Sequence, residues 1–327
     1  MADLTIIPRD APRPATADRG RLGRLFNGGE RYLPGQRKEA AGAYLFIGPT
    51  ILLLALFYFI PLIQTFYYSF THWNPFSVQR ASGAGLSNYR HLVTTAQFLS
   101  SLGHTLIYIV FTVPIGMAVG LALALLLNHP FRGRSVYRTL VFIPYIAPIV
   151  GSAFVFDFVV SPLGGVADGV LNSLGLPQIN FLNQDPWAMI SIIAFSVWQI
   201  AGFNMVIYLA ALGAVPDMYY EAGLIDGANA AQRFRSITWP LIWPSTLFLL
   251  MIGVVNSIQM FTQGYILTQG GPLTSTQVIM EWIYQQSFVS LNGGLATAGS
   301  VVLFLIGMVL TLIQLRFLGR RYAVNLG

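Results

Sequence analysis

The chain of 327 residues has no cysteine, one lysine and only 9% charged residues. The lack of cysteine excludes disulfides, thiolate catalysis and cysteine-ligated metal or iron–sulfur sites. The single lysine, Lys38, lies in "GQRKEA", so no glycine-rich loop ending in Lys-Ser or Lys-Thr is present to hold the phosphates of ATP. Soluble domains carry about 25% charged residues. A chain with so little charge cannot cover a water-facing surface, and it must face lipid.

Signs of catalysis are also missing. The four histidines, His72, His91, His104 and His129, show no HExxH or other metal-ligand spacing, and no GxSxG nucleophile elbow is present. The sequence therefore predicts a non-catalytic chain with no metal or cofactor of its own. An ion-coupled secondary carrier remains an alternative, although its usual ionisable residue near the bilayer midplane is represented only by Asp157, close to the end of an apolar run. A structural membrane protein is a further alternative.

What the chain has instead is apolar sequence: 55% of its residues are hydrophobic and the mean hydropathy is +0.63. A helix needs about 20 apolar residues to cross a bilayer. Six runs reach that length, at about 43–70, 105–127, 139–160, 187–213, 241–261 and 297–318. The first follows a hydrophilic segment too long for a signal peptide, so it is interpreted as a retained span. The prediction is an all-α, polytopic membrane protein with six transmembrane helices.

The basic residues predict the orientation of these spans. Of the chain's 18 lysines and arginines, only Arg80 and Arg90 fall between spans 1 and 2, and none falls between spans 3 and 4 or 5 and 6. The positive-inside rule then places both termini in the cytoplasm. Residues 1–40 are expected to be a disordered cytoplasmic segment, and 322–327 a short cytoplasmic tail. Because the net charge of +6 is explained by topology, no nucleic-acid partner is expected.

The most hydrophilic loop between two spans covers residues 214–240 and is cytoplasmic by the same rule. Asp217 is in position to cap a short helix that runs to about Ile225. Asp226 and Gly227 then mark a break, because glycine adopts a left-handed conformation at low cost. A second amphipathic helix follows, and Pro240 marks the start of the fifth span. This pattern fits either a docking helix for a partner protein or an ordinary surface helix.

The same loop resembles the signature of the permease subunits of binding-protein-dependent ABC importers: Glu-Ala-Ala, three residues, Gly, nine residues, Ile, one residue, Leu-Pro. The matching residues are Glu221, Ala222, Gly227, Ile237 and Pro240, while Gly223 and Trp239 replace an alanine and the leucine. "YLFIGPTILLLALFYFIPLIQTFYYSFTHWN" and "YILTQGGPLTSTQVIMEWIYQQSF" resemble the carbohydrate-uptake branch, which is related to the maltose and glycerol-phosphate permeases.

This resemblance covers residues 41–321 and implies a type I ABC importer permease fold in a bacterial inner membrane. It implies that a coupling helix at about 217–227 is seated in a cytosolic ATPase, with Asp217, Gly223, Asp226 and Arg233 in the same loop. The implied partners are a second, different permease subunit, two ATPase subunits that bind ATP and Mg²⁺, an external solute-binding protein and the sugar. Glycerol phosphate or another polyol is the alternative solute.

Polar side chains in the fourth and fifth spans are candidates for a substrate pathway. Such groups are costly in lipid, so they should face the bundle interior or a water-filled cavity. Asn256, Gln259 and Gln263 follow one another at helical spacing, beside Ser257; Gln199, Phe203 and Asn204 lie in the fourth span. The resemblance to the maltose-type permeases indicates Gly253 as a further candidate for this pathway. A sugar site needs amides and hydroxyls beside aromatic rings. The alternative is that these groups only join helices by hydrogen bonds.

Overall fold

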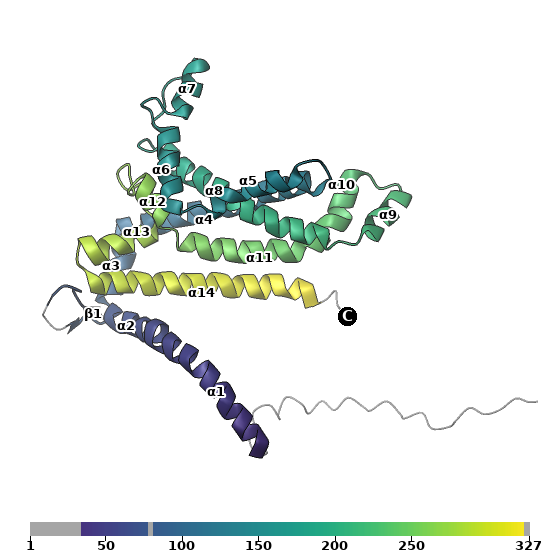
Figure 1. The fold of residues 1–327 in the computed structure, drawn as a ribbon. Coiled ribbons are helices and arrows are strands. Elements are labelled where there is room, and N and C mark those ends of the chain that lie inside the picture. Colours follow the sequence, from purple (N-terminus) through teal and green to yellow (C-terminus); the bar gives the residue numbers. More distant parts are fainter. Residues whose placement is uncertain (1–33, 78–80, 324–327) are drawn as a thin grey trace, which may run out of the picture. The chain divides into compact units, whose positions relative to one another are not determined.

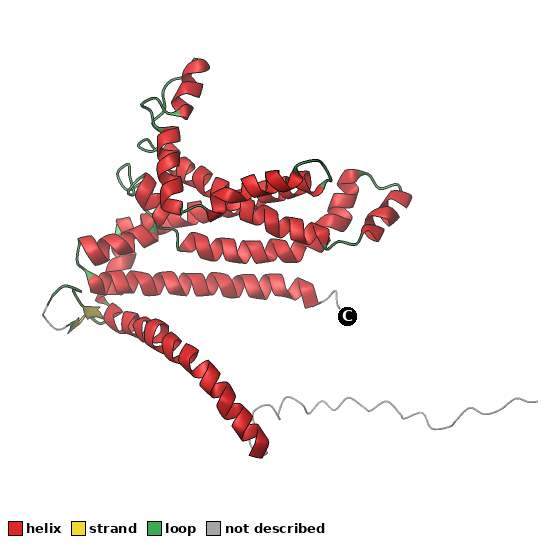
Figure 2. Cartoon of the chain, viewed as in Figure 1, coloured by secondary structure: helices red, strands yellow, loops and turns green. Residues whose placement is uncertain are grey.

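The computed structural model describes residues 34–77 and 81–323, and these residues are almost entirely helical (Figures 1 and 2). One antiparallel strand pair joins β1 (Thr71–His72) to β2 (Ser82–Gly83). The helices, with π-helical turns marked η, are α1 (Pro34–Leu54), η2 (Ala55–Phe59), α2 (Ile60–Ser69), α3 (Ser87–Thr94), α4 (Ala96–Asn128), α5 (Arg134–Ile146), α6 (Ile149–Val160), α7 (Val166–Ser173), α8 (Trp187–Gly213), α9 (Asp217–Ile225), α10 (Ala230–Arg233), η3 (Phe234–Thr238), α11 (Trp239–Ile258), α12 (Thr262–Leu267), α13 (Ile279–Tyr284), η4 (Gln285–Val289) and α14 (Gly293–Ala323).

Within these residues, five helical runs are long and apolar enough to cross a membrane, and a sixth crossing is available if one bent helix pair counts as a span. The five runs are Tyr44–Ser69, Ala96–Asn128, Trp187–Gly213, Ala230–Ile258 and Gly293–Arg316. This result confirms the all-α class and agrees with six spans. It also lengthens two of them relative to the sequence prediction, since α4 and the run ending at Ile258 begin about two to three helical turns before the predicted apolar stretch.

The third predicted span is not one continuous helix. It consists of α5 and α6, which meet at an angle of 101°. The break falls at Ala147 and Pro148, where Ala147 adopts extended backbone with ψ 142°. A residue that precedes proline is pushed out of the helical region by the pyrrolidine ring, so the chain must turn there. The prolines of this run therefore divide it into two helices, where the sequence predicted a single continuous span.

The described chain divides at Pro61 into two units. The first contains α1 and η2, and its described side chains from Tyr44 onward are exposed or half-buried within this chain. A helix that is apolar on all sides and has no buried face is suited to lipid contact. Residues 34–40, which were assigned to a disordered segment, are helical in α1. The remaining residues of that segment, 1–33, and residues 324–327 of the predicted tail lie outside the described part, so those predictions stay open.

The second unit is built around the packing of α4 against α8. Glycines let the two backbones approach: a Cβ at Gly116 would lie 2.6 Å from Ile200 Cδ1, and one at Gly120 would lie 2.4 Å from Asn204 Cβ. Such close approach is the usual role of small residues four apart in membrane helices. Buried side chains such as Ile192, Phe195 and Met205 fill the interior. α11 packs on both helices, and α14 packs on α11 (Figure 1).

The two ends of this unit carry different elements. α9 and α10 project from one end, together with the loop from α4 to α5 (Figure 1). α12 and α13 lie at the opposite end, near the start of α14. Arg138 Nη2 donates a 2.7 Å hydrogen bond to the Leu127 carbonyl in the last turn of α4, where a cation is favourable for the helix dipole. The bundle between these ends holds a pocket lined by apolar side chains together with several hydroxyl and amide groups.

Candidate functional site

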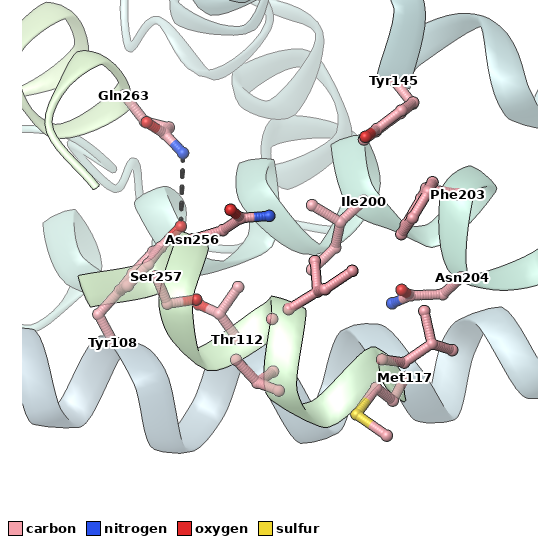
Figure 3. Close-up of a pocket in the computed structure, with 14 residues that line it drawn as sticks. Tyr108, Thr112, Met117, Tyr145, Ile200, Phe203, Asn204, Asn256, Ser257 and Gln263 are labelled. Carbon is pink, nitrogen blue, oxygen red and sulfur yellow. Dashed lines mark hydrogen bonds between the residues drawn. The ribbon is translucent and has the colours of Figure 1, made fainter. Parts of the chain in front are cut away.

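The pocket is enclosed by helices that are far apart in the sequence. α4, α8 and α11 form its main walls, α5 contributes Tyr145, and α12 contributes Gln263 (Figure 3). Gly253 brings α11 close to α4, since a Cβ there would lie 2.9 Å from Val113 Cγ1. The small size of this residue therefore shapes the pocket as well as the packing.

Hydroxyl and amide groups gather at the end of the pocket nearer to α12. Asn256 and Ser257 come from the last turn of α11, and Tyr108 and Thr112 come from α4. Gln263 Nε2 lies 3.5 Å from the Tyr108 hydroxyl, at the outer limit of a hydrogen bond (Figure 3). These groups can both donate and accept hydrogen bonds, and none of them carries a charge.

The other end of the pocket is aromatic and amide in character. The rings of Tyr145 and Phe203 are stacked, with centroids 4.8 Å apart and an interplanar angle of 22°. Asn204 lies one residue further along α8 and also lines the pocket. An aromatic face beside amides and hydroxyls suits a ligand that has both apolar ring surface and hydroxyl groups.

Five of the predicted pathway residues meet in this pocket: Phe203, Asn204, Gly253, Asn256 and Ser257. Gln199 is buried in α8 and does not line it. Gln259 does not line it either, because α11 ends at Ile258 and Gln259 leaves the helical path with φ −92° and ψ 11°. The expected helical spacing of Asn256, Gln259 and Gln263 is therefore wrong, although Gln263 returns to the pocket from α12. Sequence reasoning missed the three other lining residues that carry a hydroxyl group, Tyr108, Thr112 and Tyr145, and the apolar lining residues Val113, Met117, Ile200, Leu249 and Ile252.

The pocket in this one chain is small, with a volume of about 90 Å³. Ligand pockets generally measure about 300–1,000 Å³. The pocket of this one chain is therefore too small to hold a solute larger than a few atoms.

The loop 214–240 forms a second candidate site, at the end of the bundle where α9 projects. Gly227 has φ +75°, which confirms the predicted left-handed break after α9. Asp217 does not cap α9, because Pro216 occupies the cap position and Asp217 is already the first helical residue. An acidic residue in the first turn still favours the helix through its dipole. The predicted capping role of Asp217 is therefore wrong, although Asp217 does lie at the start of the helix.

The second helix of the loop begins with a capping box. Asn229 Oδ1 accepts from the Gln232 backbone N–H at 2.9 Å, and Gln232 Oε1 accepts from the Asn229 N–H at 2.8 Å. From Ala230 the chain is helical without interruption to Ile258. Pro240 therefore lies inside a continuous helix, directly after the π-helical turn η3, and does not mark the start of the span.

α9 is held against this long helix by its inner face. Gly223 is the buried residue of α9, and a Cβ there would lie 3.0 Å from Ile237 Cδ1 and 3.4 Å from Arg233 Cγ. The Tyr220 hydroxyl lies 3.0 Å from Thr238 Oγ1. The replacement of alanine by Gly223 in the signature thus coincides with a tight contact between α9 and the helix that leads to the pocket.

The outer face of α9 is exposed. Glu221, Ala222 and Asp226 are exposed there, beside large apolar side chains; these are Met218, Tyr219, Leu224 and Ile225, the last being 87% exposed. A soluble surface rarely exposes a group of large apolar residues on a single short helix, and such patches mark sites of protein contact. A rigid exposed helix, joined to the helix that lines the pocket, is suited to transmit a displacement between the two sites.

The comparisons with known proteins agree with this arrangement. Residues 113–323 match the family described as the binding-protein-dependent transport system inner membrane component. The chain belongs to this family.

Similar proteins include the sn-glycerol-3-phosphate transport system permease protein UgpA of Agrobacterium fabrum, which is 34% identical over 85% of this permease and 94% of its own length. The probable ABC transporter permease protein YurN of Bacillus subtilis is 31% identical over 84% and 94%. Among solved structures, a bacterial ABC transporter involved in the import of the acidic polysaccharide alginate contains a chain with 26% identity and a TM-score of 0.77, covering 88% of this permease and 98% of that chain. The bacterial alginate ABC transporter in complex with an alginate pentasaccharide-bound periplasmic protein also contains a similar chain. Its sequence identity is 25% and its TM-score is 0.76, covering 86% of this permease and 94% of that chain.

The family assignment makes this chain a component of a transport system. It also confirms a multi-pass membrane protein of the inner membrane, as the apolar runs predicted.

Proposed function

We propose that this permease forms one half of the translocation pathway of an ATP-driven importer for an uncharged sugar or oligosaccharide. Its relatives are named as permeases of transport systems, and the alginate importers share its fold. The second half of the pathway comes from a different permease subunit, and an external binding protein delivers the solute. A pocket of about 90 Å³ in one chain fits this arrangement, because a second wall is needed to hold a sugar.

The observation that carries the choice of solute is the absence of cations from the pocket wall. Among the described residues that line the pocket, the polar groups are hydroxyls and amides only. The sequence has no lysine, arginine or histidine between residues 139 and 232 or between 236 and 315. Phosphates and carboxylates are usually bound by arginine or lysine through charge-assisted hydrogen bonds. An uncharged solute with several hydroxyls suits this wall better.

Glycerol phosphate or another polyol is the second candidate, because several relatives are named as sn-glycerol-3-phosphate permeases. A neutral polyol is compatible with the same wall. A phosphate ester would need its cations from the partner permease, since this chain offers none at the pocket.

The power for transport comes from the partner ATPases in this proposal. ATP and Mg²⁺ bind to those subunits, and the exposed face of α9 around Glu221 docks into one of them. Movement of α9 is passed through its contacts with Arg233 and Ile237 to the helix that carries Asn256 and Ser257. This route requires the loop 214–240 and both chain termini to lie in the cytoplasm.

The proposal is tested by solute uptake into proteoliposomes that contain the complex purified with its own partners. Radiolabelled maltose, glycerol and sn-glycerol 3-phosphate are the probes, extended to other neutral oligosaccharides if maltose is inactive. We expect ATP-dependent uptake of a neutral sugar and none of the phosphate ester. Uptake of glycerol 3-phosphate alone would contradict the choice of solute. Uptake that follows an ion gradient without ATP would overturn the importer class.

A further inference from the structure

One acidic side chain of the described bundle is buried without a partner. Glu281, on α13, is 0% exposed, and neither of its carboxyl oxygens has a hydrogen-bond partner among the described residues. It lies between the runs that end at Ile258 and begin at Gly293, outside the candidate spans. Glutamate is almost never fully buried unless it is paired. Burial raises the pKa of the Glu281 carboxyl to about 7.

Two glycines make room for this carboxyl group. A Cβ at Gly270 would lie 2.9 Å from Glu281 Oε1, and one at Gly264 would lie 3.9 Å from Glu281 Oε2. Gly264 belongs to α12, and Gly270 to the turn that follows it with φ +79°. The carboxyl group thus lies against the backbone of α12 and its turn, and no hydrogen-bond donor of the described residues reaches it.

α12 separates Glu281 from the pocket. Gln263 lines the pocket beside Tyr108, while the next residue of the same helix, Gly264, lies over the carboxyl group. Consecutive helical residues point about 100° apart, so α12 can face the pocket with one side and the Glu281 carboxyl group with another. α12 has only six residues. A short helix between two loops is an element that can shift as a unit.

α13 is anchored to α4 by hydrogen bonds and by packing. The Ile279 N–H donates to Thr105 Oγ1 on α4 at 3.0 Å. The side chain of Gln277, just before α13, accepts from Gln97 Nε2 at 3.0 Å and from Ser101 Oγ at 3.2 Å. Trp282 is buried in the core beside Phe98. Glu281 is therefore fixed to α4, whereas α12 packs mainly on α6.

We propose that Glu281 is a proton-binding group that keeps α12 seated against the pocket when neutral and releases it when ionised. An ionised carboxylate in the seated arrangement would have neither water nor a counter-charge, which is a large cost. Movement of α12 would admit water to the carboxylate and open the pocket at the end of the bundle opposite α9. The proposal concerns the pocket wall, so it holds for any solute. It does not depend on the outcome of the uptake experiment.

The direction of the pH effect follows from the raised pKa. The seated state binds the proton more tightly than the open state, where Glu281 has an ordinary carboxyl pKa. The seated position of α12 is therefore fully stabilised at a pH below the ordinary pKa of a glutamate carboxyl group. This stabilisation is lost as the pH rises through about 7. Opening of α12 should increase over the same interval.

Other titratable groups on the packed elements must be separated from this effect. They are Tyr265 on α12, Tyr284 on α13, His104 and Tyr108 on α4, Asp157 on α6 and Tyr208 on α8. α14 carries none before Arg316. His104 lies closest to the start of α13, since its Nδ1 is 3.1 Å from the Gln277 carbonyl, and it is the group that the experiment must exclude by substitution.

The test uses a cysteine reporter under α12 in the complete complex. Met260 is buried against Gly264, and the chain has no other cysteine, so Met260→Cys can be labelled with a neutral maleimide without background. The labelling rate is measured from pH 5.5 to 8.5 in Met260→Cys and in the same reporter carrying Glu281→Gln. The ratio of the two rates cancels the thiol's own titration. We expect this ratio to rise by about tenfold or more, since each pKa unit of difference is a factor of ten.

Two matched variants make the result specific. Asp168→Asn, which neutralises another buried acid on α7, should keep the full pH response, and so should His104→Gln. A constant ratio would overturn the proposal, as would a response that disappears in His104→Gln and persists in Glu281→Gln. The carboxyl C=O band in infrared spectra of the complex without the reporter provides a second measurement. It should contain a group titrating near 7 that Glu281→Gln removes, and its absence would also overturn the proposal.

Discussion

At the scale of single residues, the pocket offers a direct comparison between two amides one turn apart. Asn256 lines the pocket and Gln259 does not, although both are exposed and close in sequence. We expect Asn256→Leu to reduce solute uptake per assembled complex about two- to tenfold, because each neutral hydrogen bond lost costs about 0.5–1.5 kcal/mol. Uptake into proteoliposomes and the yield of intact complex are the two measurements.

Gln259→Leu is the matched control for this prediction. It makes the same kind of change beyond the end of α11, so uptake should stay within about twofold of the wild-type rate. Equal losses from both substitutions would argue against a role for the pocket. A loss of complex yield in Asn256→Leu, with normal uptake by the complex that remains, would assign Asn256 to packing.

The pocket residues also show how far sequence reasoning reaches at this scale. Asn256 and Ser257 were found because polar groups in an apolar run are conspicuous. Gln259 was misplaced because "NSIQMFTQG" contains no proline and no early glycine to mark the end of α11 at Ile258. Tyr108 and Tyr145 were missed because aromatic residues are common in spans, and only tertiary packing brings these two to the pocket.

At the scale of elements, α9 is expected to act as a rigid connector. Its inner face is fixed by Gly223 and Tyr220, and its outer face is exposed around Glu221. We expect Glu221→Lys to lower solute-stimulated ATP hydrolysis and uptake by about tenfold or more, the effect of removing one central interface contact. The complex should still assemble, because Glu221 makes no contact that holds the bundle together.

The measurement is ATPase activity and subunit composition of the purified complex, with Asp185→Lys as the control. Asp185 is an exposed acid just before α8, in the loop that joins α7 to α8, so the same change in charge should leave coupling unchanged. Normal stimulation in Glu221→Lys would contradict docking through this face of α9. A loss in both variants would point to a general effect of charge.

The elements of the loop were largely predictable, and the exceptions have physical causes. The break at Gly227 follows from one residue type and was predicted with the correct left-handed backbone. The capping box between Asn229 and Gln232 was readable from its spacing but was overlooked. The unbroken helix from Ala230 to Ile258 was not predictable, because proline normally starts a helix and here follows a π-helical turn.

At the scale of the whole molecule, the number of spans followed from hydropathy, while the bend of the third span did not. A run from 139 to 160 has the composition of one helix. Pro148 forces a break at Ala147, and the angle of 101° is set by how α5 and α6 then pack on α8 and α12. The pocket likewise depends on contacts between four spans and α12, which no local pattern encodes. The orientation of the bundle in the membrane, in contrast, can be predicted from the positions of lysine and arginine along the sequence.

Orientation is the prediction that every functional role of this chain requires. The loop from α4 to α5 carries Arg132, and α5 begins with Arg134, whereas the segment from α6 to α8 has no lysine or arginine. The α4–α5 loop should therefore be cytoplasmic. Because the chain has no cysteine, His129→Cys and Leu163→Cys each introduce a single reporter at an exposed position. An impermeant maleimide should label Leu163→Cys in right-side-out vesicles and His129→Cys in inside-out vesicles. The reverse pattern would place α9 outside the cell, where no ATPase could reach it, and coupling through Glu221 would be ruled out.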